Sequence, residues 1–121
     1  MDKVLNKRRY LVVTPNIVVG EDLKEALLTY RDADVELVST LDKMVAKSYE
    51  IAIFGLPLDV VLHDRAVRAL HNAGTQVVIL NGHFPAKTLE GTGVVALSQP
   101  FSSEDVEALV QRVEMTAKAK V

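Results

Sequence analysis

The sequence predicts an α/β domain built on a doubly wound, five-stranded parallel sheet. Five short apolar runs rich in β-branched residues are spaced along the chain, and each is followed by a stretch with the apolar periodicity of a helix. Repeated strand–helix units pair their strands in parallel and place helices on both faces of the sheet. The length of 121 residues is that of one domain, so residues 1–121 are expected to form a single unit.

The composition excludes several classes of protein. Without cysteine, the chain cannot hold a disulfide framework, a thiolate nucleophile or a Cys-ligated metal. The 14 basic and 16 acidic residues leave a net charge of −2, so we expect no nucleic-acid partner. No apolar run approaches the roughly 18 residues of a membrane span. The basic amino terminus lacks the apolar stretch of a signal peptide, so we expect a cytoplasmic chain with no membrane partner.

The first half of the chain contains two predicted strand–helix units. Residues 10–13 form the first strand, and apolar residues at helical spacing predict a helix from Glu21 to about Tyr30. Residues 35–38 alternate between apolar and polar, which suits a strand at the edge of a sheet better than a central one. Thr40 is expected to cap a short helix over about residues 41–47.

The middle of the chain contains two further strands. The third strand is expected over residues 49–54, followed by one helix from Asp59 to about Asn72. Gly74 is expected to end this helix in the left-handed conformation that glycine favours. The fourth strand is expected over residues 75–80, and residues 84–90 could form one or two helical turns.

The carboxyl-terminal part contains the fifth strand and the last helix. The strand is expected over residues 94–98. Ser102 begins a Ser-x-x-acid sequence, which is typical of a helix start, and the helix is expected to run to about Met115 and give way to a polar tail. The predicted inner stripe of this helix consists of Val106, Leu109, Val110 and Val113.

Four of these strands, read with the residues that follow them, resemble the landmark strands of a response-regulator receiver domain. The most specific part of this resemblance is Pro100-Phe101 followed by a capped amphipathic helix. The resemblance covers about residues 8–116 and implies the flavodoxin-like strand order 2-1-3-4-5. It also implies a short or remodelled fourth helix, because the segment between the last two strands looks shorter than is usual in the family. The four matching segments are residues 9–13, 49–54, 76–80 and 97–101.

Receiver domains transfer a phosphoryl group to an aspartate with the help of magnesium. In this family an acid pair holds the metal, an aspartate is the nucleophile, and a hydroxyl residue and a lysine hold the phosphoryl group. The resemblance places Thr14 and Pro15 at the acid pair, Gly55 at the nucleophile, Asn81 at the hydroxyl residue and Gln99 at the lysine. None of these side chains supplies the charge that the metal or the transferred phosphoryl group needs. The resemblance therefore implies a pseudo-receiver that has lost its phosphoacceptor site.

We expect a phosphorylation-independent signalling module that acts by protein–protein interaction, with neither catalytic activity nor a cofactor. Its partner would be another protein or a second copy of the chain in a weak homodimer. The contact is expected on the last helix, on the fifth strand and in the remodelled fourth-helix region, where family members usually meet their partners. The face predicted for this contact consists of Ala96, Phe101, Val106, Val110 and Val113.

The alternative is a small-molecule or anion binder, or a minor enzyme, that uses the carboxyl edge of the sheet. A deep apolar cavity with convergent polar groups would favour this alternative, whereas a shallow polar edge would favour the interaction module. The residues expected to line such a site are Thr14, Asn16, Asn81, His83 and Gln99.

The remaining polar motifs favour structural roles. His63 and His71 are about 12 Å apart along the predicted helix, too far to share a metal. Asp59 is interpreted as an N-cap or first-turn acid. Residues 91–93 form a Gly-Thr-Gly turn that lacks the lysine and the following helix of a phosphate-binding loop.

Overall fold

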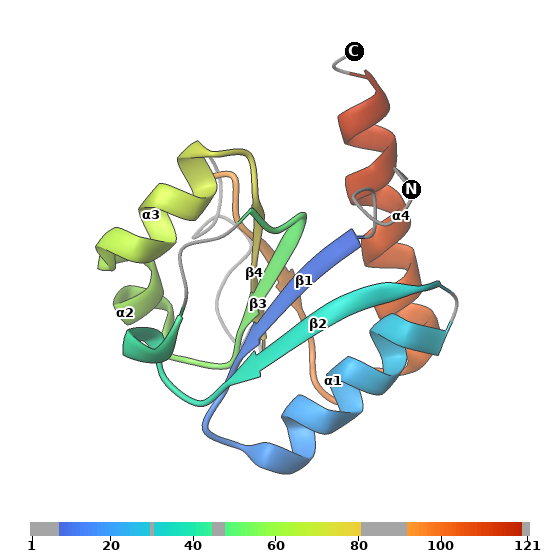
Figure 1. Ribbon diagram of the computed structural model, residues 1–121, viewed down its shortest axis with the longest axis horizontal. Helices are drawn as coiled ribbons and strands as arrows, with labels where there is room; N and C mark the ends of the chain where they lie inside the picture. Colours follow the sequence, from blue (N-terminus) through green and yellow to red (C-terminus); the bar gives the residue numbers. More distant parts are fainter. Residues whose placement is uncertain (1–7, 30, 45–47, 81–91, 120–121) are drawn as a thin grey trace.

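The computed structural model describes residues 8–29, 31–44, 48–80 and 92–119, and these form an open sheet flanked by helices (Figure 1). All neighbouring strands are parallel, and their order is β2-β1-β3-β4-β5. The predicted fold class and strand order are therefore confirmed. The strands are β1 (Arg8–Val13), β2 (Ala33–Val38), β3 (Ile51–Phe54), β4 (Gln76–Leu80) and β5 (Val95–Leu97).

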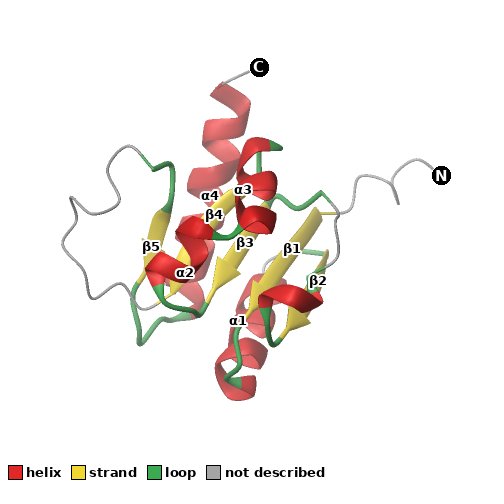
Figure 2. Ribbon diagram, turned by 90° about the vertical axis from the view of Figure 1, so that its left-hand side faces the viewer, coloured by secondary structure: helices red, strands yellow, loops and turns green. Residues whose placement is uncertain are grey.

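The central strands are buried on both faces, as their apolar runs predict. Every residue of β3 is fully buried, and so are Tyr10–Val13 of β1. Side chains alternate between the two faces, so the sheet separates two hydrophobic cores. One core packs under α1 (Ile17–Thr29) and α4 (Ser103–Ala119), and the other under α2 (Leu58–His63) and α3 (Arg65–Asn72). Figure 2 shows α2 and α3 in front of the sheet and α4 behind it.

Helix α1 begins at Ile17, earlier than the predicted start at Glu21. The Asn16 side chain ends the preceding turn by accepting a hydrogen bond from the Val19 N–H at 3.1 Å, as an N-cap residue does. The apolar pattern could not show this start. Ile17 and Val18 are 72% and 69% exposed, so the first turn does not belong to the buried stripe.

The helical turn after β2 is shorter than the helix predicted over about residues 41–47. Only Leu41–Lys43 form a 3₁₀ turn, and residues 45–47 lie outside the described residues. Thr40 does not cap this turn. It forms a hydrogen bond with the Asp42 carboxyl group instead, which lowers the pKa of Asp42. Residues 81–91, where the short or remodelled fourth helix was expected, also lie outside the described residues.

The single helix predicted over residues 59–72 is two helices. The backbone leaves the helical conformation at Asp64, whose ψ is 133°. The Asp64 carboxylate accepts hydrogen bonds from the Ala66 and Val67 N–H groups at 2.8 and 3.1 Å, so it is the N-cap of α3. Asp59 lies in the first turn of α2, where a negative charge is favourable.

Helix α3 ends as predicted at Gly74, which has a φ of 102°. The Gly74 N–H donates to the His71 carbonyl and the Thr75 N–H donates to the Leu70 carbonyl, both at 3.0 Å. This is the Schellman arrangement, which satisfies two carbonyls at the helix end and turns the chain directly into β4.

Helix α4 also begins as predicted. The Ser102 Oγ accepts from the Asp105 N–H at 3.1 Å, and the Asp105 carboxylate accepts from the Ser102 N–H at 2.9 Å, which forms a capping box. The helix continues to Ala119, so the polar tail expected after Met115 is helical at its start. Its inner stripe packs on the same core as α1.

We predict that Asp64→Ala destabilises the chain by about 1 kcal/mol, because the substitution leaves two N–H groups of α3 without their cap. Urea denaturation followed by circular dichroism would measure this change. Asp59→Ala is the matched control, because Asp59 is exposed and does not cap α2. Equal losses for the two variants would contradict the break at Asp64.

Candidate functional site

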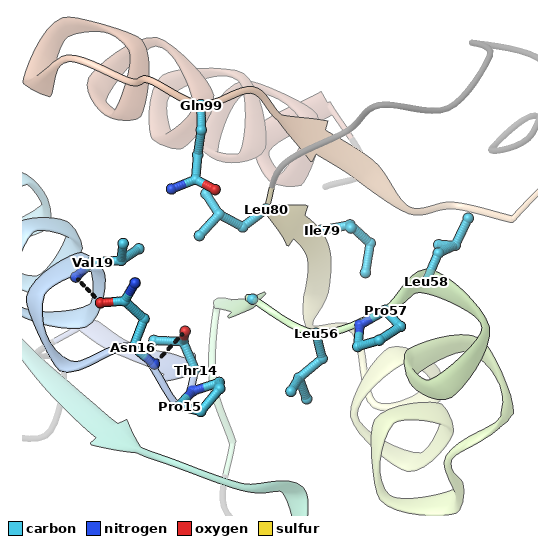
Figure 3. Close-up of a pocket in the computed structure, with 11 residues that line it drawn as sticks. Thr14, Pro15, Asn16, Val19, Leu56, Pro57, Leu58, Ile79, Leu80 and Gln99 are labelled. Carbon is cyan, nitrogen blue, oxygen red and sulfur yellow. Dashed lines mark hydrogen bonds between the residues drawn. The ribbon is translucent and has the colours of Figure 1, made fainter.

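A cavity of about 450 Å³ lies where β1, β3 and β4 end, at the carboxyl edge of the sheet. Ligands of open α/β sheets bind at this edge. Five of the predicted site residues line this cavity (Figure 3), namely Thr14, Pro15, Asn16, Gly55 and Gln99. Asn81 and His83 lie outside the described residues. The other lining residues are Val19, Leu56, Pro57, Leu58, Ile79 and Leu80.

Thr14 and Gly55 lie against each other in the site. A Cβ atom placed on Gly55 would lie 2.8 Å from the Thr14 Oγ1 and 3.0 Å from the Thr14 Cβ. Thr14 is only 5% exposed, so its side chain has little room to move. Gly55 does not have a positive φ, so the position needs glycine for space rather than for backbone conformation. The Thr14 side chain therefore occupies the space that a side chain at position 55 would need.

Hydrogen bonds hold Thr14 and Asn16 in place. The Thr14 N–H donates to the Val38 carbonyl at 3.0 Å, which joins the end of β1 to the end of β2. The Thr14 Oγ1 accepts from the Asn16 N–H at 3.2 Å, and the Asn16 side chain caps α1. The predicted polar ring is thus partly used to shape the turn into α1. The Gln99 amide extends from the segment after β5 toward Leu80 and the cavity (Figure 3).

The lining of the cavity is electrically neutral. No Asp, Glu, His, Lys or Arg is among its described residues, and its apolar side chains come from α1, β4 and the segment after β3. In the described part of the chain, no three His, Asp or Glu residues lie close enough to hold a metal ion. The oxygen donors at the cavity are a hydroxyl, amides and backbone carbonyls, none of which carries the charge that a hard divalent cation prefers.

A second groove, of about 330 Å³, adjoins the cavity along α1. The two share Val19 and Gln99 in their linings. Asp22 and Glu25 bring two carboxylates to the groove, on the side of α1 that faces the turn between β5 and α4. Sequence reasoning missed both residues, because they look like ordinary exposed acids until α1 is packed beside this turn.

The predicted interaction face is wrong at two positions. Val106 and Val110 belong to α4 and are completely buried, because their stripe of the helix packs on the sheet. Phe101 and Val113 are partly buried against the same core, whereas Ala96 on β5 is exposed. The outer surface beside β5 is formed instead by Ala96, Ala108 and Arg112, and Met115 is 69% exposed farther along α4.

The two described histidines lie away from the cavity. The His63 Nδ1 lies 2.7 Å from the Asp59 carbonyl oxygen within α2. The His71 ring packs on Gly93, where an added Cβ would lie 2.7 Å from the His71 Cε1. None of the helices in the described ranges is long and apolar enough to cross a membrane.

Comparison with known proteins gives similarity in structure only. No protein-family model matches the chain, and no curated protein matches it. Among solved structures, the chemotaxis response regulator CheY4 of Vibrio cholerae superposes with a TM-score of 0.69, covering 88% of this chain and 98% of its own. The chain has the receiver fold.

Two further receiver structures support this assignment of the fold. The CheY-like receiver domain protein of Methanospirillum hungatei gives a TM-score of 0.70 and covers 93% of this chain and 98% of its own. The activated DrrB receiver domain gives 0.68, with 90% and 98% covered. Sequence identities to the three proteins are 21%, 17% and 16%, so the likeness establishes the fold and leaves the function to the residues of the site.

We predict that Gly55→Ala destabilises the chain by about 1–3 kcal/mol, because its Cβ meets the buried Thr14 side chain. Thr14→Ala removes the Oγ1, the closer of the two contacting atoms, and should reduce the cost of Gly55→Ala. A double-mutant cycle measured by urea denaturation would report this coupling. Strictly additive effects would show that the two positions do not compete for space.

Proposed function

We propose that the chain is a phosphorylation-independent, receiver-like signalling module that acts by protein–protein interaction. The observation that carries the proposal is the contact between Thr14 and Gly55. The position that corresponds to the phosphoacceptor has no side chain, and the Thr14 side chain fills the space beside it. The receiver fold supports a signalling role.

The neutral lining of the cavity supports the loss of phosphoryl transfer. Phosphoryl transfer depends on preorganised charges that stabilise the transferring group. Each such contact lowers the activation barrier by roughly 3–4 kcal/mol. Thr14 and Pro15 supply no carboxylate for a metal, and Gln99 supplies a dipole in place of a full positive charge. No single substitution restores these contacts.

Restoring the nucleophile alone should therefore not restore phosphorylation. Gly55→Asp protein, incubated with magnesium and acetyl phosphate, should show no increase in intact mass, because the metal site and the positive charge remain absent. Circular dichroism must first establish that the variant is folded, since its Cβ meets Thr14. Gly55→Ala is the matched control for folding and for nonspecific acetylation. A labile gain of about 80 Da on the aspartate variant alone would contradict the proposal.

Self-association is proposed at the β5 side of the sheet. Strand β5 is an edge strand, and the exposed surface beside it combines Ala96 and Ala108 with Arg112 and Met115. An unpaired strand edge with an adjacent small-residue surface permits close approach of a second copy. This surface replaces the buried stripe that the sequence predicted.

Light scattering at tens of micromolar should give an average mass above the 13.3 kDa of one chain. Met115→Lys should lower this mass toward that of the monomer, because it places a charge on the proposed contact surface. Leu28→Lys is the control, because Leu28 is an exposed apolar residue of α1 that does not line the surface beside β5. A monomer at every concentration would remove self-association from the proposal.

A small-molecule binder remains the second candidate, favoured by the cavity itself. Its volume of about 450 Å³ lies within the range of small-ligand sites, and its apolar lining is combined with the Gln99 amide. Because the described part of the chain brings no cation to the cavity, an uncharged or apolar ligand fits better than an anion. The cavity also continues into a groove along α1, which favours a longer occupant.

A further inference from the structure

The cavity at the carboxyl edge of the sheet and the groove along α1 form one continuous depression with two different ends. They meet at Val19 and Gln99, which line both. The cavity end contains Leu56, Ile79 and Leu80 and no charged side chain from the described ranges, whereas the groove end contains two carboxylates. An occupant that matches both ends must be apolar at one end and positively charged at the other.

We propose that this depression binds an extended segment of a partner protein in which an apolar side chain is followed, two residues later, by a basic side chain. The inference rests on the proposed function, since it names the surface and the partner chemistry of the interaction module. The apolar side chain would enter the cavity, and the basic side chain would lie in the groove against Asp22 and Glu25.

The charges of the groove are available to a partner. Asp22 and Glu25 are exposed, and no Lys, Arg or His in the described ranges forms an ion pair with either carboxylate. Among the residues that the structure describes, none of those lining the groove is basic. Arg31, just beyond α1, forms a bidentate pair with Glu107 at 2.7 and 2.8 Å, so its guanidinium group is already bound.

The apolar end also extends beyond the cavity. Ile17 and Val18, in the first turn of α1, are 72% and 69% exposed, and Val60 in α2 is 45% exposed. Neighbouring Pro15 and Pro57 are exposed at the cavity rim. These side chains add exposed apolar surface to α1 and α2, the two helices that supply part of the cavity lining.

The spacing of the two ends determines the sequence pattern of the partner. On α1, Asp22 and Glu25 lie about 4.5 and 9 Å along the helix axis from Val19. A cation between the two carboxylates would therefore lie about 7 Å from the junction with the cavity. Residues i and i+2 of an extended chain lie on the same side and are about 6.5–7 Å apart. The pattern that fits is therefore apolar–any residue–basic, with the backbone of the apolar residue at the junction and its side chain reaching into the cavity.

The test uses the full chain, labelled with ¹⁵N, and a capped hexapeptide with a central Leu-Ser-Arg sequence as the probe. Titration at low salt should produce saturable shifts of the Val19, Asp22 and Gln99 amides. Replacing the peptide's arginine with glutamate should weaken binding roughly three- to tenfold, as expected for the loss of exposed ion pairs. Leucinamide alone should bind more weakly still, which separates a peptide site from a small-molecule site.

Variants of the chain supply the second half of the test. Asp22→Asn combined with Glu25→Gln should weaken binding of the arginine peptide by the same roughly three- to tenfold factor. It should strengthen binding of the glutamate peptide, because it removes the repulsion between like charges. Glu21→Gln is the matched control, because Glu21 is an exposed acid on α1 that does not line the groove. Equal affinity for the two peptides, no effect of the double substitution, or no saturable binding would each overturn the inference. Phosphorylation of Gly55→Asp would instead overturn the proposed function, so the two failures are distinguishable.

Discussion

The contact between Thr14 and Gly55 determines the shape of the carboxyl edge of the sheet. Thr14 joins the end of β1 to β2 through its N–H group and holds the turn into α1 through its hydroxyl. Gly55 lets the end of β3 approach this side chain, because a Cβ atom would come within 3.0 Å of two of its atoms. The turn then places Asn16 where it caps α1, so the position of α1 beside the cavity depends on the same contact.

The composition of the cavity follows from this arrangement. In a receiver that transfers phosphoryl groups, buried charges at this edge are tolerated because a metal and a lysine balance them. Here the corresponding side chains are neutral, and the residues that remain are the apolar ends of the strands and loops, such as Leu56 and Leu80. The described lining is therefore apolar where a phosphoryl-transfer site is charged.

The apolar pattern of the sequence predicted the strands of the sheet, and the family resemblance predicted their order. The surfaces of the fold were predicted less well. Buried parallel strands are apolar at almost every position, so each one can be located in the sequence as a short apolar run. The start of α1 was not visible, because Ile17 and Val18 are exposed apolar residues. The break at Asp64 was missed because a hydrogen-bonding side chain, rather than an apolar pattern, produces it. Val106 and Val110 were correctly predicted in the inner stripe of the last helix and wrongly included in the contact face, because side chains that the sheet covers cannot also face a partner.

The groove depends on how α1 and α4 are fixed relative to each other, which no local pattern encodes. Beyond the groove, Arg31 joins the end of α1 to α4 through Glu107. Burial opposes the charge of Arg31, but the hydrogen bond with Glu107 more than compensates and raises the pKa of Arg31. The same hydrogen bond lowers the pKa of Glu107, so the pair stays ionised. Because Glu107 already binds Arg31, this cation does not need Asp22 or Glu25. The Arg31–Glu107 ion pair therefore fixes α1 against α4 without using the two carboxylates of the groove.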